Sequence, residues 1–155
     1  MTIKLVKKER KMVTQIRTEQ GKIRLGLYSI LYVMELANNA RELHTTKITV
    51  DGVRVRLKTV KFDVFRSSGT RCNCCGLKGE YFALETFNNP TDLTHYYHFE
   101  LYGLVYGKEI MLNKDHKLPV AKGGKNYRSN LRTLCFTCNL EKGDKLIELN
   151  KEFNI

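Results

Sequence analysis

The chain has 155 residues, which suits one ordinary domain with appendages and is too short for two independent cores. Its hydrophobic fraction of 42% and charged fraction of 28% exclude a generally disordered chain. The formal net charge of +11 favours a polyanionic partner, and the absence of an apolar run of about eighteen residues excludes an ordinary membrane-spanning helix. The start MTIKLVKKER also lacks the apolar core of a signal peptide.

The N-terminal segment is predicted to contain a basic helix or arm followed by a buried helix. Residues 5–24 are polar with sparse apolar positions, which predicts a basic helix or arm whose lysines either face solvent or contact DNA. In residues 24–43, apolar side chains recur at helical spacing, and this pattern predicts a buried helix.

A hairpin is predicted next, in KITVDGVRVRL (residues 47–57). Apolar and polar residues alternate on both sides of Asp51-Gly52, a dipeptide that favours a two-residue turn. Arg54 and Arg56 share one face of this hairpin, where they either lie on phosphates or face water.

The remainder of the chain predicts a mixed α+β arrangement without repeats. The expected elements are a short helix over residues 59–69, strands over 80–87, 95–104, 109–116 and 130–135, a turn at VYGK, and a C-terminal helix over 137–153 weakened by Gly143.

Two Cys-x-x-Cys pairs stand out among five cysteines. An odd number excludes a complete disulfide framework, and two pairs at this spacing are typical of a tetrahedral structural zinc site in a reducing, cytoplasmic setting. Cys74 is then the unused thiol, although a register that uses Cys74 stays open. The predicted zinc ligands are Cys72, Cys75, Cys135 and Cys138.

The segment KDHKLPVAKGGKNYRSNLRTLCFTCNLEKGDK, residues 114–145, resembles the HNH endonucleases, in particular zinc-stapled bacteriophage members. Asp-His, Pro, Gly-Gly, Asn-Leu, Cys-x-x-Cys-Asn and Lys-Gly follow in the order of that family. The resemblance covers about residues 60–148. It implies an α+β fold with a ββα-metal core, and it divides the chain into a possible DNA-recognition region (1–58) and a nuclease domain (59–155).

The same resemblance implies roles for four residues. His116 is the general base, Asn130 ties the loop together, and Asn139 stands where many members have the last histidine of the motif. That departure is similar to the endonuclease VII type of Holliday-junction resolvase, in which an asparagine there binds the catalytic ion. Asp115 is then the second ligand of a divalent ion, Mg²⁺ or Mn²⁺.

The chemistry of phosphodiester hydrolysis agrees with these roles. Oxygen ligands hold an ion that neutralises charge on the phosphate, and a neutral imidazole accepts the proton of the attacking water. Asp115 and His116 cannot share a face of a regular strand, so we expect the strand to end or bend there. Seven cations surround the motif and are the expected phosphate contacts: Lys114, Lys117, Lys122, Lys125, Arg128, Arg132 and Lys142.

Simpler interpretations exist for each part, since an Asp-His pair is usually a surface pair and Asn139 can cap a helix. The parts in this order predict a metal-dependent DNA endonuclease of a bacterial or phage-infected cell. Two alternatives stay open: a non-catalytic zinc-stapled nucleic-acid-binding protein, and a resolvase of branched DNA that acts as a homodimer.

Overall fold

The computed structural model describes residues 10–18, 21–45, 47–87 and 96–146. Its contacts form two compact units. The first unit contains Met1–Thr59 and Tyr81–Glu100, and the second contains Val60–Glu80 and Leu101–Ile155. Residues 81–100 therefore group with the N-terminal segment, whereas the sequence suggested a single boundary near residue 58.

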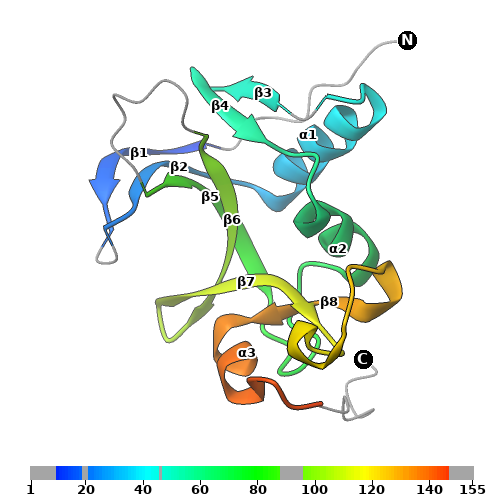
Figure 1. Cartoon of the computed structure of the whole chain (residues 1–155). Helices are drawn as coiled ribbons and strands as arrows, with labels where there is room; N and C mark the ends of the chain where they lie inside the picture. Colours follow the sequence, from blue (N-terminus) through cyan, green and yellow to red (C-terminus); the bar gives the residue numbers. More distant parts are fainter. Residues whose placement is uncertain (1–9, 19–20, 46, 88–95, 147–155) are drawn as a thin grey trace. The chain divides into compact units, whose positions relative to one another are not determined.

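The first unit combines an antiparallel sheet, one helix and a separate hairpin (Figure 1). Strand β2 (Ile23–Tyr28) pairs with β1 (Arg10–Arg17) and with residues 82–86 of β5 (Gly79–Thr86). Tyr28 packs edge-on against Phe99, with ring centroids 5.2 Å apart, and both side chains are buried. Helix α1 (Ile30–Glu42) buries Val33, Ala37 and Ala40.

Two N-terminal predictions are wrong. The predicted basic helix or arm contains strand β1, and its residues 5–9 lie outside the described residues. The predicted helix over 24–43 starts with strand β2, and only the part from Ile30 is helical. Ser29 separates the two, because its Oγ accepts a hydrogen bond from the Tyr32 backbone N–H at 3.2 Å and caps the helix. Ile23, Leu25 and Leu27 alternate with Arg24 and Gly26, the period of a strand, and β2 is paired on both edges.

The predicted hairpin is confirmed as β3 (Lys47–Val50) and β4 (Val53–Arg56). Asp51 and Gly52 form its turn with φ of 49° and 84°, the positive values that a two-residue hairpin turn of this type requires. Val55 is buried, while Arg54 and Arg56 are exposed.

The second unit contains the ββα core. Strand β7 (Lys108–His116) pairs with β6 (His98–Val105) on one side and with β8 (Leu131–Cys135) on the other. Helices α2 (Val60–Ser68) and α3 (Phe136–Lys142) pack on β7 and β8. The architecture is thus α+β with a ββα core made of β7, β8 and α3 (Figure 1).

Most predicted elements of this unit are present, but the C-terminal helix is shorter than predicted. Helix α3 ends at Lys142, where Gly143 takes a φ of 55°, and residues 147–155 lie outside the described part of the chain. No helix among the described residues is long and apolar enough to cross a membrane.

Gly103 lets strand β6 approach the first cysteine segment closely, and Gly79 lets the two ends of that segment meet. A Cβ on Gly103 would lie 2.6 Å from the Lys78 carbonyl oxygen, and one on Gly79 would lie 2.6 Å from the Thr70 carbonyl oxygen. Backbone therefore packs directly on backbone here, which holds the segment that carries Cys72 and Cys75 in a fixed place within the second unit.

Candidate functional site

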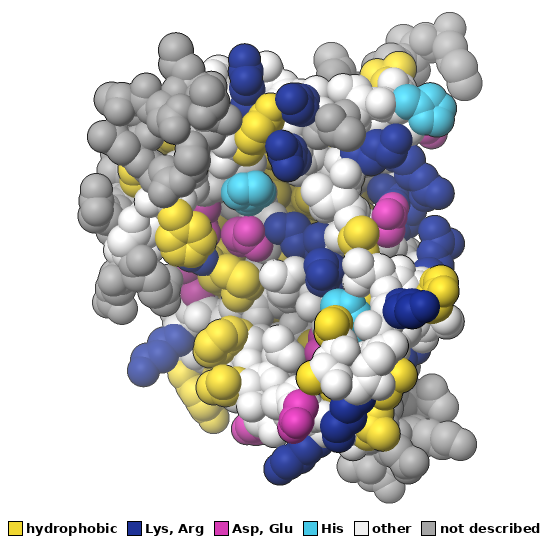
Figure 2. Space-filling view, in the orientation of Figure 1, with side chains coloured by type: hydrophobic (Ala, Val, Ile, Leu, Met, Phe, Trp, Pro, Cys, Tyr) yellow, Lys and Arg dark blue, Asp and Glu magenta, His cyan; other side chains and the backbone are white. Residues whose placement is uncertain are grey.

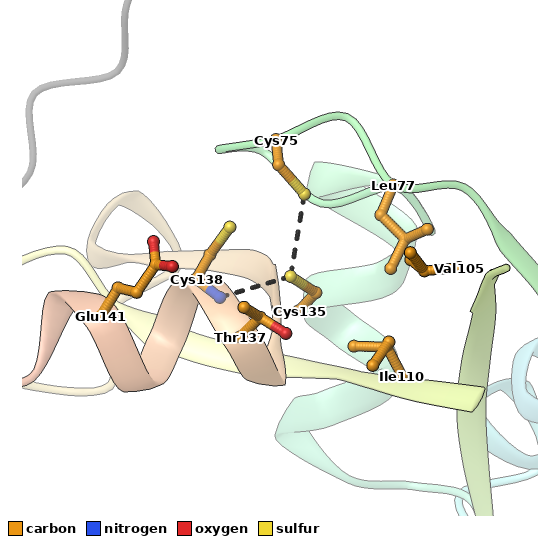
Figure 3. A pocket seen from close by; sticks show the side chains of 8 residues that line it. All are labelled: Cys75, Leu77, Val105, Ile110, Cys135, Thr137, Cys138 and Glu141. Atoms are coloured by element: carbon orange, nitrogen blue, oxygen red, sulfur yellow. Dashed lines mark hydrogen bonds between the residues drawn. The ribbon is translucent and has the colours of Figure 1, made fainter. Parts of the chain in front are cut away.

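Four cysteine sulfurs converge in the second unit. The Sγ atoms of Cys72, Cys75, Cys135 and Cys138 all lie within 4.8 Å of one another, and Cys75 and Cys135 are 3.7 Å apart (Figure 3). Tetrahedral zinc with Zn–S bonds of about 2.3 Å needs sulfurs about 3.8 Å apart. The donor set fits zinc, and Cys74 is not part of it.

Backbone N–H groups point at these sulfurs. Cys72 Sγ accepts from the N–H of Cys135 at 3.3 Å and from that of Cys75 at 3.5 Å, and Cys135 Sγ accepts from the N–H of Cys138 at 3.4 Å. Gly76, with a φ of 77°, closes the first turn by donating to the Cys72 carbonyl. Such donors stabilise thiolates, the form that binds metal.

The cysteine pKa values explain why this cluster needs a cation. Burial raises the pKa of Cys135 to about 11 and raises that of Cys138 as well. Burial also acts to raise the pKa of Cys72, but the backbone donors of Cys75 and Cys135 outweigh it and lower that pKa. Four neighbouring thiolates repel one another, and a divalent ion at their centre offsets both the repulsion and the burial.

The pocket beside the sulfurs is largely apolar, with Thr137 and Glu141 as its polar lining residues. Leu77, Val105 and Ile110 line a pocket of ≈ 290 Å³ beside Cys75 and Cys135 (Figure 3). Four protein sulfurs already complete a tetrahedral shell, so a zinc here has no open position for a water molecule. A zinc ion held by these four sulfurs would therefore have a structural role.

The histidine of the motif is paired with an amide. His116, the last residue of β7, lies with its Nε2 2.7 Å from Oδ1 of Asn126. Because an amide oxygen only accepts hydrogen bonds, Nε2 is the donor in this pair, and in the neutral imidazole with this tautomer Nδ1 presents the lone pair. Asn126 was not predicted from the sequence, since a polar residue in a loop has no spacing that singles it out.

The loop between β7 and β8 is closed by Asn130. Its Oδ1 accepts from the Leu118 backbone N–H at 2.8 Å, and its Nδ2 donates to the carbonyls of Leu118 at 3.1 Å and Lys125 at 3.0 Å. A Cβ on Gly124 would lie 1.8 Å from the Leu118 carbonyl oxygen, so only glycine fits there. These contacts fold the loop onto itself and hold Asn126 opposite His116.

Asp115 lies on the opposite face of β7 from His116. The strand stays paired through Asp115↔Arg132 and His116↔Leu131 and ends at His116. Because the strand is regular up to this point, the side chains of Asp115 and His116 point to opposite faces of the sheet. Asp115 is buried with two cations: Arg132 Nε donates to Oδ2 at 3.1 Å and Lys142 Nζ donates to Oδ1 at 3.0 Å. Arg132 and Lys142 are each only 2% exposed.

The two cations beside Asp115 affect the predicted site of the catalytic ion, because they occupy its carboxylate oxygens. One carboxylate faces two buried cations, which already leaves a surplus of positive charge around Asp115. Asn139 is exposed on α3, and its side chain makes no hydrogen bond within the described part of the chain. Carboxylate and amide oxygens suit Mg²⁺ or Mn²⁺, but a divalent ion fits beside Asp115 only when Lys142 leaves Oδ1.

The seven cations predicted around the motif are in two environments. Arg132 and Lys142 are buried on Asp115 and do not reach the surface. Lys114 is half-buried. The remaining four cations are exposed: Lys117, Lys122, Lys125 and Arg128.

An open polar pocket of ≈ 670 Å³ lies beside the loop. Two of the exposed cations, Lys117 and Arg128, line it together with Ser68 and Asn73, and the Ser68 Oγ donates to the Asn73 Oδ1 at 3.0 Å. Two cations among neutral hydrogen-bonding groups suit a phosphate. Ser68 and Asn73 come from different segments, so the sequence did not indicate that they meet.

One known protein family matches part of the second unit. Residues 106–145 match the family model of the HNH endonucleases. The chain carries an HNH endonuclease domain. The match includes His116, Asn130 and Asn139 and confirms the resemblance seen in the sequence, and the four-cysteine cluster agrees with a zinc-stapled form of this domain. Nothing matched among curated proteins or solved structures.

The HNH family is generally a nuclease family that acts on DNA with divalent metals. The matched domain supports a nuclease-type function in this general sense.

The four-cysteine cluster leads to a direct prediction. We expect the purified chain to bind one zinc ion, and Cys138→Ser to lose it, because three sulfurs and a hydroxyl bind zinc poorly. Each kcal/mol of lost stability lowers the melting temperature by about 2–4 °C in a chain of this size. Cys74→Ser is the matched control and should keep both the zinc and the melting temperature. Metal analysis and thermal melting test this, and a loss of zinc in Cys74→Ser would contradict the assigned ligands.

Proposed function

We propose that the protein is a metal-dependent endonuclease that hydrolyses DNA phosphodiester bonds, with His116 as the general base. The observation that carries this proposal is the His116–Asn126 pair within the HNH domain, beside a loop with exposed cations. The paired amide orients the imidazole, and the cations provide contacts for the phosphates on either side of the scissile bond.

The base chemistry follows from the tautomer. With its Nε2 proton held by Asn126, the imidazole of His116 accepts a proton at Nδ1 from the water that attacks phosphorus. The bond between phosphorus and the 3′ oxygen breaks, the 3′ oxygen takes a proton from solvent water, and the products are a 5′-phosphate and a 3′-hydroxyl, as in the family. Histidine suits this step because imidazole changes protonation near neutral pH.

Asp115 and Asn139 are the proposed ligands of the catalytic ion, Mg²⁺ or Mn²⁺. When bound, such an ion neutralises charge on the phosphate and stabilises the leaving oxygen. In the structure described here Lys142 holds Oδ1 of Asp115, so we propose that Lys142 releases this oxygen when the ion binds. Arg132 keeps the other oxygen in place through its Nε.

Phosphate contacts are assigned to the cations that reach the surface. Lys117 and Arg128 line the open polar pocket, so a phosphate of the substrate strand fits there. The remaining contacts come from Lys114, Lys122 and Lys125.

A non-catalytic nucleic-acid-binding protein remains the second candidate. One observation favours it: both oxygens of Asp115 already accept hydrogen bonds from buried cations, as in a purely structural ion cluster. The two candidates differ in whether DNA is cleaved.

Cleavage of supercoiled plasmid tests the proposal. We expect nicked or linear DNA with Mg²⁺ or Mn²⁺ and none without a divalent ion. His116→Ala should reduce the rate by about 10²–10⁴-fold, the usual contribution of a general base. The exposed His44→Ala is the matched control and should cleave normally. If zinc-loaded, folded His116→Ala cleaves at the wild-type rate, this mechanism is wrong.

Asn126 should matter for rate rather than for binding. Asn126→Ala leaves the imidazole free to rotate and to change tautomer, so we expect kcat to fall by about tenfold or more with little change in KM. Asn113→Ala removes another exposed amide from the same unit and serves as the control. Steady-state cleavage kinetics separate the two parameters, and an unchanged kcat would argue against a positioning role for Asn126.

Lys142 should compete with the catalytic ion. Lys142→Met removes its positive charge from Asp115, so we expect Mn²⁺ to bind to the zinc-loaded protein about tenfold more tightly or better, a difference of about 1.4 kcal/mol. The melting temperature without Mn²⁺ should fall, because a buried carboxylate loses one of its partners. Lys145→Met, at an exposed position just after the same helix, is the control. Equal Mn²⁺ affinity in calorimetric titration would show that Lys142 does not compete.

A further inference from the structure

The hairpin of the first unit presents a basic face that the HNH domain does not account for. Lys47, Thr49, Arg54 and Arg56 are exposed, whereas Val50 and Val55 are buried. Lys and Arg side chains also gather near β3 and β4 on the face drawn in Figure 2. We call these four exposed residues, together with Tyr96, the hairpin surface.

The strand register places like charges together. Lys47 lies directly opposite Arg56, and Thr49 lies opposite Arg54. Like charges in directly opposed positions destabilise a hairpin. None of the three cations forms an ion pair with an acid anywhere in the part of the chain that the structure describes. A polyanion therefore stabilises this cluster of positive charges more than water alone does.

Tyr96 is built into this surface. The Tyr97 backbone N–H donates to the Arg54 carbonyl at 2.9 Å, which fixes the segment along strand β4. The Tyr96 ring centroid lies 4.4 Å from Arg56 Cζ and 5.3 Å from Lys47 Nζ, so both cations contact the same aromatic ring. A hydrogen bond from Lys47 lowers the pKa of the Tyr96 hydroxyl, and Arg54 acts in the same direction.

The spacing of the arginines suits a nucleic-acid backbone. Two residues along a strand span about 6.8 Å, which equals the rise of about two nucleotides of one DNA strand. A guanidinium binds phosphate through two parallel hydrogen bonds, and stacking on Tyr96 limits the freedom of Arg56 before DNA binds. An aromatic ring among cations also offers a face for a sugar or an unstacked base.

We propose that the hairpin surface binds the phosphate backbone of DNA independently of base sequence, as a contact separate from the cations of the HNH loop. This proposal rests on the proposed function for its choice of DNA over other polyanions. Arg54 and Arg56 carry the phosphate contacts, Lys47 adds charge, and Tyr96 holds Arg56 and Lys47 in place.

Fluorescence anisotropy with a labelled DNA duplex, without Mg²⁺ or Mn²⁺, tests the proposal at several salt concentrations. The Arg54→Gln/Arg56→Gln variant should bind at least about tenfold more weakly, and the slope of log K against log salt should fall by about two. Lys78→Gln/Lys108→Gln removes the same two charges from exposed positions of the second unit and is the matched control. It should change affinity by less than about threefold. Equal effects of the two variants would overturn the proposal.

Tyr96 gives a second variant that leaves the charge unchanged. Tyr96→Leu should weaken binding several-fold, while Tyr96→Phe keeps the ring and should bind normally. Thermal melting verifies that each variant is folded. A wild-type affinity for Tyr96→Leu would overturn the role of the ring.

The outcomes for the hairpin surface and for the nuclease can be told apart. If the wild-type protein cleaves DNA while the hairpin variants bind like the wild type, the hairpin proposal fails and the endonuclease stands. If no cleavage occurs but the hairpin variants lose affinity and salt dependence as described, the DNA-binding surface stands without the endonuclease. Binding of the hairpin surface to an acidic protein instead of DNA would appear as unchanged DNA affinity and would overturn the proposal.

Discussion

The four-sulfur cluster is the interaction on which the second unit depends. It joins two turns about sixty residues apart in the chain. Within it, Cys135 has three roles. This residue ends strand β8, caps helix α3 through its Sγ, and is a predicted zinc ligand. The position of α3, and with it Asn139 and Lys142, therefore depends on the cluster. A small domain gains from such a staple because its apolar core alone is modest.

Strand β7 connects this staple to the chemistry by a simple alternation of side chains. Asp115 points inward to Arg132 and Lys142, and His116 points to the loop that Asn130 closes. The proposed acceptor of the proton and the proposed ligand of the ion are thus neighbours in sequence but lie on opposite faces of one strand. This arrangement gives the two groups different surroundings: Asp115 lies in a buried charge cluster, and His116 lies at the surface.

Much of the second unit could be predicted from the sequence, because its signals are local. The two Cys-x-x-Cys pairs, the alternating strands and the order of the HNH motif all depend on residues near one another in the chain. The predicted helix over residues 24–43 failed at its N-terminal end for a different reason. Its helical spacing comes mainly from residues of α1, whereas Ile23, Leu25 and Leu27 alternate with Arg24 and Gly26 as in a strand, and β2 pairs with β1 and with the distant strand β5. Helix α3 also ends early, at a glycine whose weakening effect was visible in the sequence.

The amino-acid sequence alone shows which donors are available: four thiols at zinc spacing, an Asp-His pair, and asparagines that follow in the order of the motif. Which of them are free to act depends on the fold. It buried Arg132 and Lys142 against Asp115, paired His116 with Asn126, and set Tyr96 over Lys47 and Arg56. The physical reason is that burial and pairing depend on residues far apart in the chain, whereas the chemical identity of a side chain is a property of one position.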